Sequence, residues 1–449
     1  MAEVVAGVAG WLASLGVARG DVVSWQLPNT LEAYLLYRAS WRLGAVAAPV
    51  HHGAGPADVA AALAAVSPSV VIAGEGLPAS SWPNALPPEA IVPGEHPAAV
   101  PVDVASLAVV LFTSGSTGVP KAVLHTHRGL VSKARTMAAV HGLGPEDVVL
   151  MPAPLAHISG LLNGVLVPGV AGMTTVLMGR WDPSAALELI ADERVSFMIG
   201  PPTFFVSLMS APEFKPEQVA SLRLVSSGGA GVTPSFVESA AEAFGCLVKR
   251  TYGSTEAPTV TTSGAGDPAD KARDTDGRAA GPVEVRVVDT GEVWVRGPEV
   301  CEGYLDQAAT RSAFTEDGWF RTGDLGVLDA DGWLTITGRI KDVIIRGGEN
   351  ISAAEVEAAL EAHPDVRQAV AVGYPDERLG HRVCAFVVAT APFGLEACRE
   401  WMASSGVTRF KWPERVLQVS SLPVLAAGKI DRAALERLAA EASPETQPK

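Results

Sequence analysis

Short runs of β-branched and aliphatic residues recur along the first 250 residues, most of them followed by a stretch with helical periodicity. The runs lie at 22–28, 69–74, 195–200 and 222–229, and helical stretches cover 30–45, 202–210 and 233–245. This alternation is typical of parallel sheets with helices on both faces. The pattern therefore predicts an α/β fold whose N-terminal part contains helix-covered parallel sheets.

The pattern changes near residue 282. The runs VEVRVVD, GEVWVRG and GWLTITG alternate apolar and polar residues between Gly-Asp and Asp-Gly turns, which predicts a small antiparallel β subdomain. Residues 351–449 mix helical and strand patterns, as in a small α+β domain. We expect an N-terminal domain at 1–340 and a C-terminal domain at 341–449, and the segment 264–281 is expected to be an exposed loop.

Length and charge narrow the class of protein. A chain of 449 residues exceeds one ordinary core, so at least two domains are expected. The 34 Lys and Arg against 49 Asp and Glu give a net charge of −15, which argues against general attraction to nucleic acid or anionic membranes. The four cysteines have no metal-ligand spacing and are expected to be free thiols.

The N-terminal residues do not resemble a signal peptide. Residues 1–21 lack a basic region before their apolar positions and are expected to form a helix closed by Gly20. The longest oily stretch, 161–178, is interrupted by Asn163, Pro168 and glycines, so no membrane insertion is expected. We predict a cytoplasmic protein.

The segment TSGSTGVPK, residues 113–121, combines glycines, hydroxyls and a lysine. It follows a predicted buried strand at 107–112 and precedes a predicted helix at 127–142, so we expect it at a strand-to-helix turn, where backbone N–H groups bind anions. It departs from the G-x-x-x-x-G-K-[ST] loop because Ala122 follows the lysine. Taken alone, it fits a polyphosphate loop and a solvated Ser/Gly turn equally well.

Five segments in a fixed order favour the first interpretation. TSGSTGVPKAV, YGSTEAP, WFRTGDLG, GRIKDVIIRGGENIS and GKIDR resemble the adenylate-forming superfamily of acyl-CoA synthetases, non-ribosomal adenylation domains and firefly luciferase, across nearly the whole chain. The resemblance implies that ATP and Mg²⁺ activate a carboxylic acid to an acyl adenylate, and that coenzyme A then displaces AMP. Two alternatives are a free-standing enzyme that loads a carrier protein's phosphopantetheine, and a non-catalytic nucleotide- or acyl-binding relative.

The same resemblance implies the nucleotide-binding residues. Tyr252 would stack on adenine opposite the backbone at 228–230, Asp324 would bind the ribose hydroxyls, and Arg339 would add a bond to the ribose or phosphate. Alternatively, Tyr252 is a buried core residue and Arg339 forms a surface ion pair. The implied ATP-binding residues are Thr113, Ser114, Gly115, Ser116, Thr117, Gly118, Lys121, Gly228, Gly229, Ala230, Tyr252, Gly253, Asp324 and Arg339.

Catalytic roles follow from the motifs as well. Thr255 would bond the α-phosphate, Glu256 and Thr117 would hold Mg²⁺, and Lys429 would bridge the attacking carboxylate and the α-phosphate. Lys341 is the implied hinge of the C-terminal domain, which would rotate after adenylation. Gly347 and Gly348 would then leave a narrow tunnel for the pantetheine arm of CoA. Oligomeric state, monomer or homodimer, is left open.

Specificity is expected from strand ends around the adenylate. The predicted acyl-pocket residues are His157, which is also counted with the catalytic group, Gly160, Pro202, Phe204, Ser227 and Pro258. These segments contain no Lys or Arg, although Arg273 or Arg278 could supply a cation for a second carboxylate. Several segments, such as PLAHISGLLNG and IIRGGENIS, most resemble those of the family branch that contains cyclohexanecarboxylate and medium-chain acyl-CoA ligases. We therefore expect a neutral hydrophobic acid.

Overall fold

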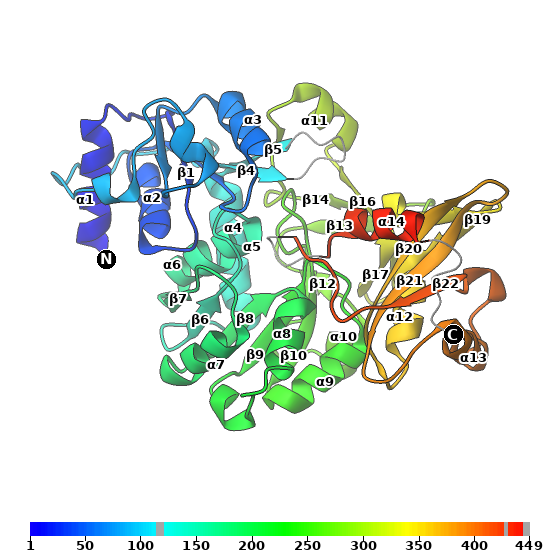
Figure 1. Ribbon diagram of the computed structural model, residues 1–449. Helices are drawn as coiled ribbons and strands as arrows, with labels where there is room; N and C mark the ends of the chain where they lie inside the picture. The colour runs from blue at the N-terminus through cyan, green and yellow to red at the C-terminus, as the bar shows by residue number, and fades with distance from the viewer. Residues whose placement is uncertain (114–120, 426–429, 443–449) are drawn as a thin grey trace.

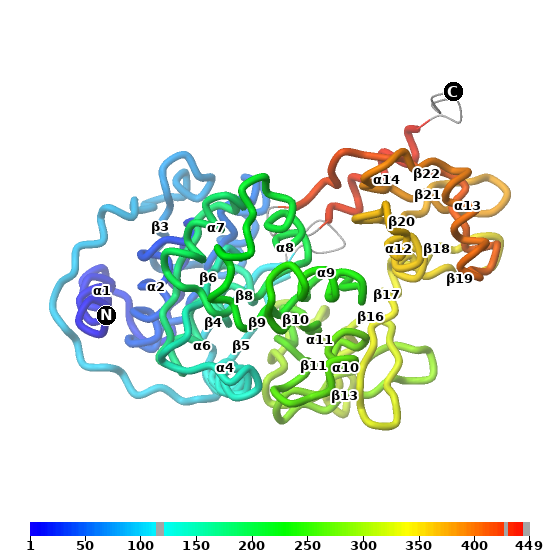
Figure 2. The backbone as a smooth tube through the Cα atoms, turned by 90° about the horizontal axis from the view of Figure 1, so that it is seen from below, coloured from blue at the N-terminus to red at the C-terminus, as the bar shows by residue number. Residues whose placement is uncertain are grey.

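The computed structural model describes residues 1–113, 121–425 and 430–442. Three sheets with their helices form a large part, and a fourth sheet forms a smaller part at one side of it (Figure 1). The view from below shows the same two parts joined near β17 (Figure 2). The division at residues 340 and 341 remains a prediction, although the fourth sheet begins at Val343.

The first sheet has the strand order β15-β5-β4-β2-β1-β3, with β1 to β4 parallel and β5 and β15 antiparallel. Helix α3 packs on one face, and α1, α2 and α4 contribute to the core on the other. The bounds are α1 (Ala2–Ser14), β1 (Val22–Gln26), α2 (Leu31–Arg42), β2 (Val46–Val50), α3 (Pro56–Val66), β3 (Val70–Ala73), β4 (Leu107–Thr113), β5 (Lys121–Thr126), α4 (His127–His141) and β15 (Gly303–Tyr304).

The second sheet has the order β12-β11-β10-β9-β8-β6-β7, with parallel pairing from β10 to β7. Its outer core involves α7, α8 and α9. The bounds are β6 (Val148–Met151), α5 (Ile158–Leu161), α6 (Val167–Ala171), β7 (Thr174–Leu177), α7 (Pro183–Asp192), β8 (Phe197–Gly200), α8 (Pro202–Met209), β9 (Leu224–Gly228), α9 (Pro234–Phe244), β10 (Leu247–Tyr252), β11 (Thr261–Thr262), α10 (Ala269–Asp274) and β12 (Arg278–Ala279).

One apolar core joins the two large sheets. It combines residues of β1, β2 and β4 with residues of β6, β8 and β9, and α4 and α5 lie between the sheets (Figure 1). Because both faces of each sheet are covered, strands such as β3, β6 and β8 consist of continuous apolar residues. This confirms the predicted α/β fold with helix-covered parallel sheets.

The third sheet is entirely antiparallel, as the alternating pattern predicts. Its order is β13-β14-β16-β17, from β13 (Glu284–Val287), β14 (Glu292–Arg296), β16 (Phe320–Leu328) and β17 (Leu334–Arg339), and α11 (Gln307–Ala313) lies between β15 and β16 in the chain. The inward residues of β13, β14 and β16 pack against Tyr252 of the second sheet. This contact connects the small sheet to the end of β10.

The fourth sheet has the order β19-β18-β21-β20, with β22 added parallel to β21. Its elements are β18 (Val343–Arg346), β19 (Glu349–Ser352), α12 (Ala353–Glu361), β20 (Val366–Asp376), β21 (Gly380–Ala389), α13 (Leu395–Ser404), β22 (Arg415–Gln418) and α14 (Arg432–Glu441). A short helical turn, Ile340–Asp342, leads into it from β17. The predicted α+β character of this part agrees with these elements.

The predicted strand-to-helix turn at the hydroxyl-rich segment is wrong. Lys121–Thr126 forms β5, which pairs antiparallel with β4 so that Thr113 lies opposite Lys121. Helix α4 begins only at His127, where the Thr126 hydroxyl accepts a hydrogen bond from the backbone N–H of Gly129 at 3.3 Å. The segment therefore joins two antiparallel strands, and the argument from a helix N-terminus does not apply to it.

Two other local expectations need correction. Helix α1 ends at Ser14 and is followed by Gly16, whose φ is 90°. The helix therefore ends before Gly20, the residue that was expected to close it. The expected exposed loop at 264–281 contains α10 and β12, and its Asp276 is buried in an ion pair with Arg250 at 2.8 Å.

The oily stretch at 161–178 is divided among α5, a π-helical turn at Leu162–Leu166, α6 and β7. Among the described residues, no helix is long and apolar enough to cross a membrane.

Candidate active site

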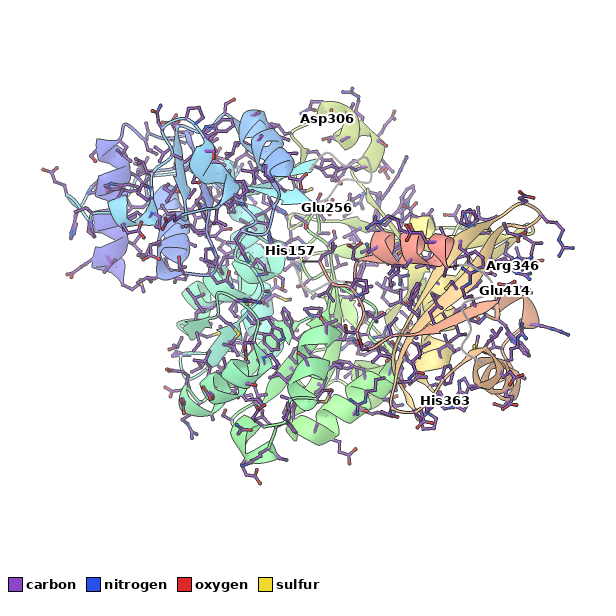
Figure 3. The ribbon with its side chains drawn as sticks, in the orientation of Figure 1. His157, Glu256, Asp306, Arg346, His363 and Glu414 are labelled. Carbon is purple, nitrogen blue, oxygen red and sulfur yellow. The ribbon has the colours of Figure 1, made fainter. Side chains whose placement is uncertain are left out.

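A cavity opens at the carboxyl ends of the parallel strands of the second sheet. Figure 3 shows His157 and Glu256 near this region, in the middle of the large part. Its empty volume is about 730 Å³ with the open mouth included, within the range of small-molecule sites, about 300–1,000 Å³. It is lined by Ala153, Pro154, His157, Ile158, Ser159, Leu162, Asn163, Ile199, Gly200, Pro201, Gly228, Gly229, Thr251, Tyr252, Gly253, Ser254, Thr255, Pro258 and Thr259.

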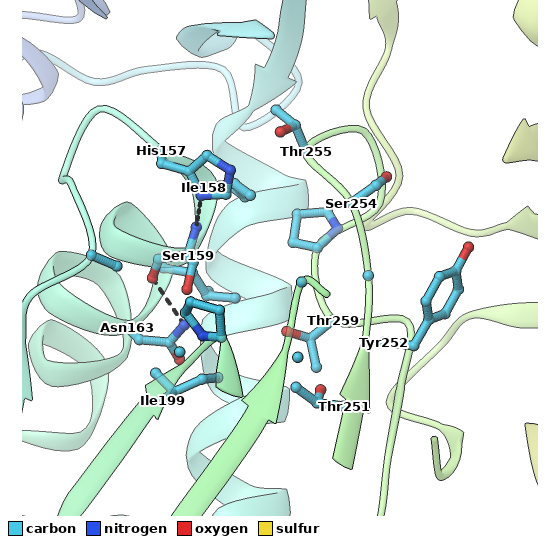
Figure 4. A pocket seen from close by; sticks show the side chains of 18 of the residues that line it. His157, Ile158, Ser159, Asn163, Ile199, Thr251, Tyr252, Ser254, Thr255 and Thr259 are labelled. Atoms are coloured by element: carbon cyan, nitrogen blue, oxygen red, sulfur yellow. Dashed lines mark hydrogen bonds between the residues drawn. The ribbon is translucent and has the colours of Figure 1, made fainter. Parts of the chain in front are cut away.

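One wall of the cavity is the start of α5. His157 is the N-cap, and its Nδ1 accepts a hydrogen bond from the backbone N–H of Ser159 at 3.3 Å. Asn163 Nδ2 donates to the Ser159 carbonyl at 3.0 Å (Figure 4). The π-helical turn that follows brings Leu162 and Asn163 to the wall, and such turns are frequent at functional sites.

The opposite wall is the loop from Gly253 to Val260. A Cβ atom at Gly253 would lie 2.4 Å from the backbone nitrogen of Thr259, so the two ends of the loop touch through their backbones. The Thr255 carbonyl is 2.7 Å from His125 Nε2 on β5. Burial lowers the pKa of His125 to about 4, so the ring is neutral and donates this bond through Nε2.

Glu256 faces β15 and β5. Its Oε1 accepts a hydrogen bond from the Tyr304 hydroxyl at 2.8 Å, and its backbone carbonyl accepts one from Cys301 N–H at 2.7 Å. The ammonium of Lys121 lies over the Tyr304 ring, 5.1 Å from its centroid. Burial is the main reason that the pKa of Tyr304 is raised, so the phenol stays a donor to Glu256. A carboxylate and a lysine thus stand at the same edge.

Tyr252, Asp324 and Arg339 are also brought together. The Tyr252 hydroxyl donates to Asp324 Oδ2 at 2.7 Å, and Arg339 Nε lies 2.9 Å from Asp324 Oδ1. Burial raises the pKa of Asp324, and Arg339 opposes that shift. In Figure 4 the Tyr252 ring points away from the His157 side of the cavity, toward the third sheet. Each Asp324 oxygen still has a lone pair for another donor.

The structure divides the predicted acyl-pocket residues into two groups. His157 and Pro258 line the cavity, whereas Gly160, Pro202, Phe204 and Ser227 are not among its lining residues. A Cβ at Gly160 would lie 2.1 Å from the Pro154 carbonyl, so this glycine serves backbone packing. Phe204 is 5% exposed and stacks on Trp181, so its ring packs in the core.

Sequence reasoning missed several lining residues, namely Leu162, Asn163, Ile199 and Thr251. Asn163 lies four residues after Ser159, the spacing at which side chains of one helix meet. That spacing was the available signal. Ile199 lies within the apolar run that forms β8, and its pattern is that of an ordinary strand residue.

The predicted residues of the C-terminal part lie apart from the cavity or outside the described ranges. Lys341 is exposed in the turn before β18. Gly347 and Gly348 have φ of 58° and 90° and form the two-residue turn of the β18–β19 hairpin, a conformation that favours glycine. Lys429 and the phosphate-loop residues Ser114, Gly115, Ser116, Thr117 and Gly118 lie outside the described residues.

Comparison with known proteins agrees with this arrangement. The family of AMP-binding enzymes matches residues 1–305, and the C-terminal domain of AMP-binding enzymes matches 355–429. The medium-chain fatty-acid–CoA ligase of Escherichia coli is 33% identical, with 96% of this chain and 83% of that protein covered. The sulfoacetate–CoA ligase of Cupriavidus necator is 32% identical, with 94% and 88% covered.

Solved structures give the same result. ATP-bound MatB from Rhodopseudomonas palustris superposes with a TM-score of 0.88 at 27% identity, covering 98% of this chain and 93% of that one. The o-succinylbenzoate CoA synthetase MenE of Bacillus subtilis, in complex with its acyl-adenylate intermediate, gives 0.84 at 26% identity, covering 97% and 91%.

The fold and the cavity are those of an adenylate-forming enzyme. The chain belongs to the AMP-binding enzyme family. The predicted fold and the predicted enzyme class, an AMP-forming acid:CoA ligase, are confirmed by these comparisons. The individual site residues remain predictions.

Proposed function

We propose that this protein activates a neutral, hydrophobic carboxylic acid with ATP and transfers the acyl group to the thiol of coenzyme A. The observation that carries the proposal is the cavity itself. Apolar walls from Ile158, Leu162 and Ile199 adjoin the Tyr252–Asp324 pair, and Glu256 lies beside the Lys121 edge. An acid and a nucleotide can therefore meet between these groups.

The nucleoside would occupy the Tyr252 side. Tyr252 offers a flat ring, and the glycine backbone at 228–229 offers a wall without bulk, continued by Ala230. Asp324 would accept bonds from the ribose hydroxyls, with Arg339 next to it at 2.9 Å. A buried carboxylate paired with Arg339 suits this bidentate task.

The phosphates would extend toward β4 and β5. Thr113 and Lys121 stand opposite each other at the two ends of the segment with Ser114, Gly115, Ser116, Thr117 and Gly118. Thr255 would bond the α-phosphate. Counter-charge here is the main requirement, because nucleotidyl transfer is catalysed mostly by positioning and charge stabilisation.

Magnesium fits the Glu256 position. Within the described ranges no cluster of three or more His, Cys, Asp or Glu could hold a metal ion. Mg²⁺ usually binds one or two carboxylates together with substrate phosphates, and Tyr304 occupies only one Glu256 oxygen. Glu256 would therefore hold the ion with the phosphates and Thr117, and bound Mg²⁺ would neutralise charge on the phosphate oxygens.

The acid is proposed to carry no charged group other than the carboxylate that reacts. Among the described lining residues, none is Lys, Arg, Asp or Glu. Arg273 pairs with Asp274 and Glu238, and Arg278 stacks on Trp333 and pairs with Asp267, so both arginines are engaged on the surface. A second carboxylate in the cavity would find no lysine or arginine among these residues and would have a large desolvation cost.

The acceptor step would use the C-terminal part. Lys429 is proposed to neutralise charge during adenylation, after which rotation about Lys341 would bring Gly347 and Gly348 to the site. Figure 3 shows Arg346, next to this turn, far from His157 and Glu256 in the present arrangement. CoA is favoured as acceptor because the curated relatives named above are CoA ligases.

Acid-dependent exchange of pyrophosphate into ATP tests the proposal. A panel should pair neutral medium-chain and alicyclic acids with dicarboxylic and sulfonated acids of matched length, and should compare CoA with a holo carrier protein as acceptor. We expect exchange with neutral acids and acyl-CoA as product. Exchange with no acid would refute adenylation, preference for charged acids would refute the pocket assignment, and transfer to the carrier alone would refute CoA as acceptor.

A further inference from the structure

A buried ion pair lies behind the cavity, outside the set of residues assigned above. Lys133 on α4 and Glu299, in the link between β14 and β15, are each 1% exposed, and Lys133 Nζ lies 2.6 Å from Glu299 Oε2. Burial lowers the pKa of Lys133, and Glu299 opposes that shift. Charged groups this deep are rare unless they are paired. The contacts of this pair therefore need a structural explanation.

The lysine is bonded to the loop that forms the cavity wall. Its ammonium donates to the Thr259 carbonyl and to the Ala280 carbonyl, both at 2.9 Å. With the ion pair to Glu299, three oxygens surround the ammonium. Ala280 N–H in turn bonds the Val260 carbonyl at 2.9 Å. Lys133 therefore fastens the point at which the loop rejoins the sheet.

Thr259 adopts a backbone conformation that needs such support. Its φ is 39°, and a β-branched residue in the left-handed region is a conformational outlier. Such residues persist only where the surrounding structure over-determines them, and they cluster at active sites. Thr259 lines the cavity, and its backbone packs against Gly253. The strain thus lies in the wall that an acid would touch.

Glu299 connects the same loop at a second point. Its Oε1 accepts bonds from the hydroxyls of Ser132 at 2.8 Å and Thr136 at 3.1 Å, so the carboxylate is held by α4. Two residues later, Cys301 N–H donates to the Glu256 carbonyl. One short segment therefore holds the loop both at Glu256 and, through Lys133, at Thr259.

We infer that Lys133 and Glu299 are positioning residues for acid activation, which fix the strained Thr259 wall so that the acid's carboxylate meets the α-phosphate. The inference rests on the proposed function. Because Thr259 faces the acid side of the cavity, away from Tyr252 and Asp324, loss of the pair should impair use of the acid much more than use of ATP.

The test compares Lys133→Met, Glu299→Gln and the double variant Lys133→Met/Glu299→Leu with wild type. The double variant removes both buried charges, so it keeps the fold testable if Lys133→Met alone does not fold. Lys271→Met, in an exposed pair with Asp329, is the matched control. Melting temperature is measured first. The acid and ATP dependence of pyrophosphate exchange, and hydrogen exchange of peptides covering 253–262, are then measured at one temperature below every transition.

We expect acid kcat/KM to fall about 10- to 100-fold, since small misplacements of positioned groups have effects of this size. The KM for ATP should change less than threefold, hydrogen exchange should rise at 253–262, and the double variant should recover melting temperature without recovering acid kcat/KM. The inference is overturned if folded variants keep wild-type protection at 253–262, if acid and ATP use fall equally, or if the double variant recovers both. Should wild type activate no acid, the proposed function fails, and the hydrogen-exchange comparison still decides whether the pair holds the loop.

Discussion

At the scale of single residues, buried polar groups reveal where this chain departs from ordinary packing. His141 at the end of α4 is 3% exposed, lies 5.5 Å from the Phe197 ring, and has no hydrogen-bond partner for either ring nitrogen among the described residues. Burial, followed by the nearby charges of Lys249 and Arg223, places its pKa well below the usual value. This histidine therefore stays neutral in the fold.

Stability should fall on acidification for that reason. The unfolded chain protonates His141 near its ordinary pKa of about 6.5 and the folded chain does so only at much lower pH, so below about 6.5 the unfolded state binds more protons. One such group contributes a slope of about 1.4 kcal/mol per pH unit. We expect His141→Leu to reduce this slope in urea unfolding between pH 7 and pH 5.5. An unchanged slope in His141→Leu would refute the assignment.

Single residues also show what a pattern can tell about the site. The motif residues Tyr252, Asp324 and Arg339 were placed from sequence, and the structure brings them into one hydrogen-bonded group. Phe204 is buried on Trp181 and is absent from the cavity lining, because an aromatic near a strand end fits a pocket wall and a core equally well. The Lys133–Glu299 pair has no local signal, since its partners are 166 positions apart and only the fold joins them.

At the scale of elements, the turn after β10 depends on close backbone contact. Gly253 has no room for a side chain because Thr259 N would lie 2.4 Å from its Cβ. The glycine is therefore required by the loop's own packing, whether or not its N–H contacts ATP. The same holds for Gly228, whose Cβ would lie 2.2 Å from the Thr251 carbonyl.

Gly253→Ala should displace the loop that carries Thr255 and Glu256. Overpacking of this kind typically destabilises by about 1–3 kcal/mol, and we expect pyrophosphate exchange to fall at least 10-fold with it. Gly231→Ala is a suitable control, because a Cβ there has nothing within 4 Å. Melting temperature and exchange rate are the measurements, and equal behaviour of the two variants would contradict the packing argument.

Element prediction succeeded where period and length were clear and failed where pairing partners were distant. The runs that became β1, β8 and β9, and the helices α2, α8 and α9, were visible from local pattern. β5 was missed because its residues follow a Ser/Gly-rich segment and acquire strand structure by pairing with β4. Sheet order likewise depends on contacts between distant residues, which one sequence does not display.

At the scale of the whole molecule, the account depends on a small C-terminal part that changes its contacts with a fixed cavity. Figures 1 and 2 both show the segment 419–425 running from the small part toward the large one. Val424 and Ile430, which flank the segment with Lys429, pair as an isolated antiparallel bridge. The Gly347–Gly348 turn lies in the β18–β19 hairpin of the same part, and the proposed rotation about Lys341 would bring it to the cavity.

The most direct test of this account measures acyl-CoA formation by wild type and Lys429→Ala, starting either from ATP and acid or from a synthetic acyl adenylate. Wild type should make acyl-CoA from both starting points and should release one AMP, rather than ADP, for each acyl-CoA formed. Lys429→Ala should lose formation from ATP at least 100-fold, because the proposed charge neutralisation at the α-phosphate is gone, yet should convert the acyl adenylate at near the wild-type rate. Release of ADP by wild type, or equal loss of both reactions in the variant, would contradict the account.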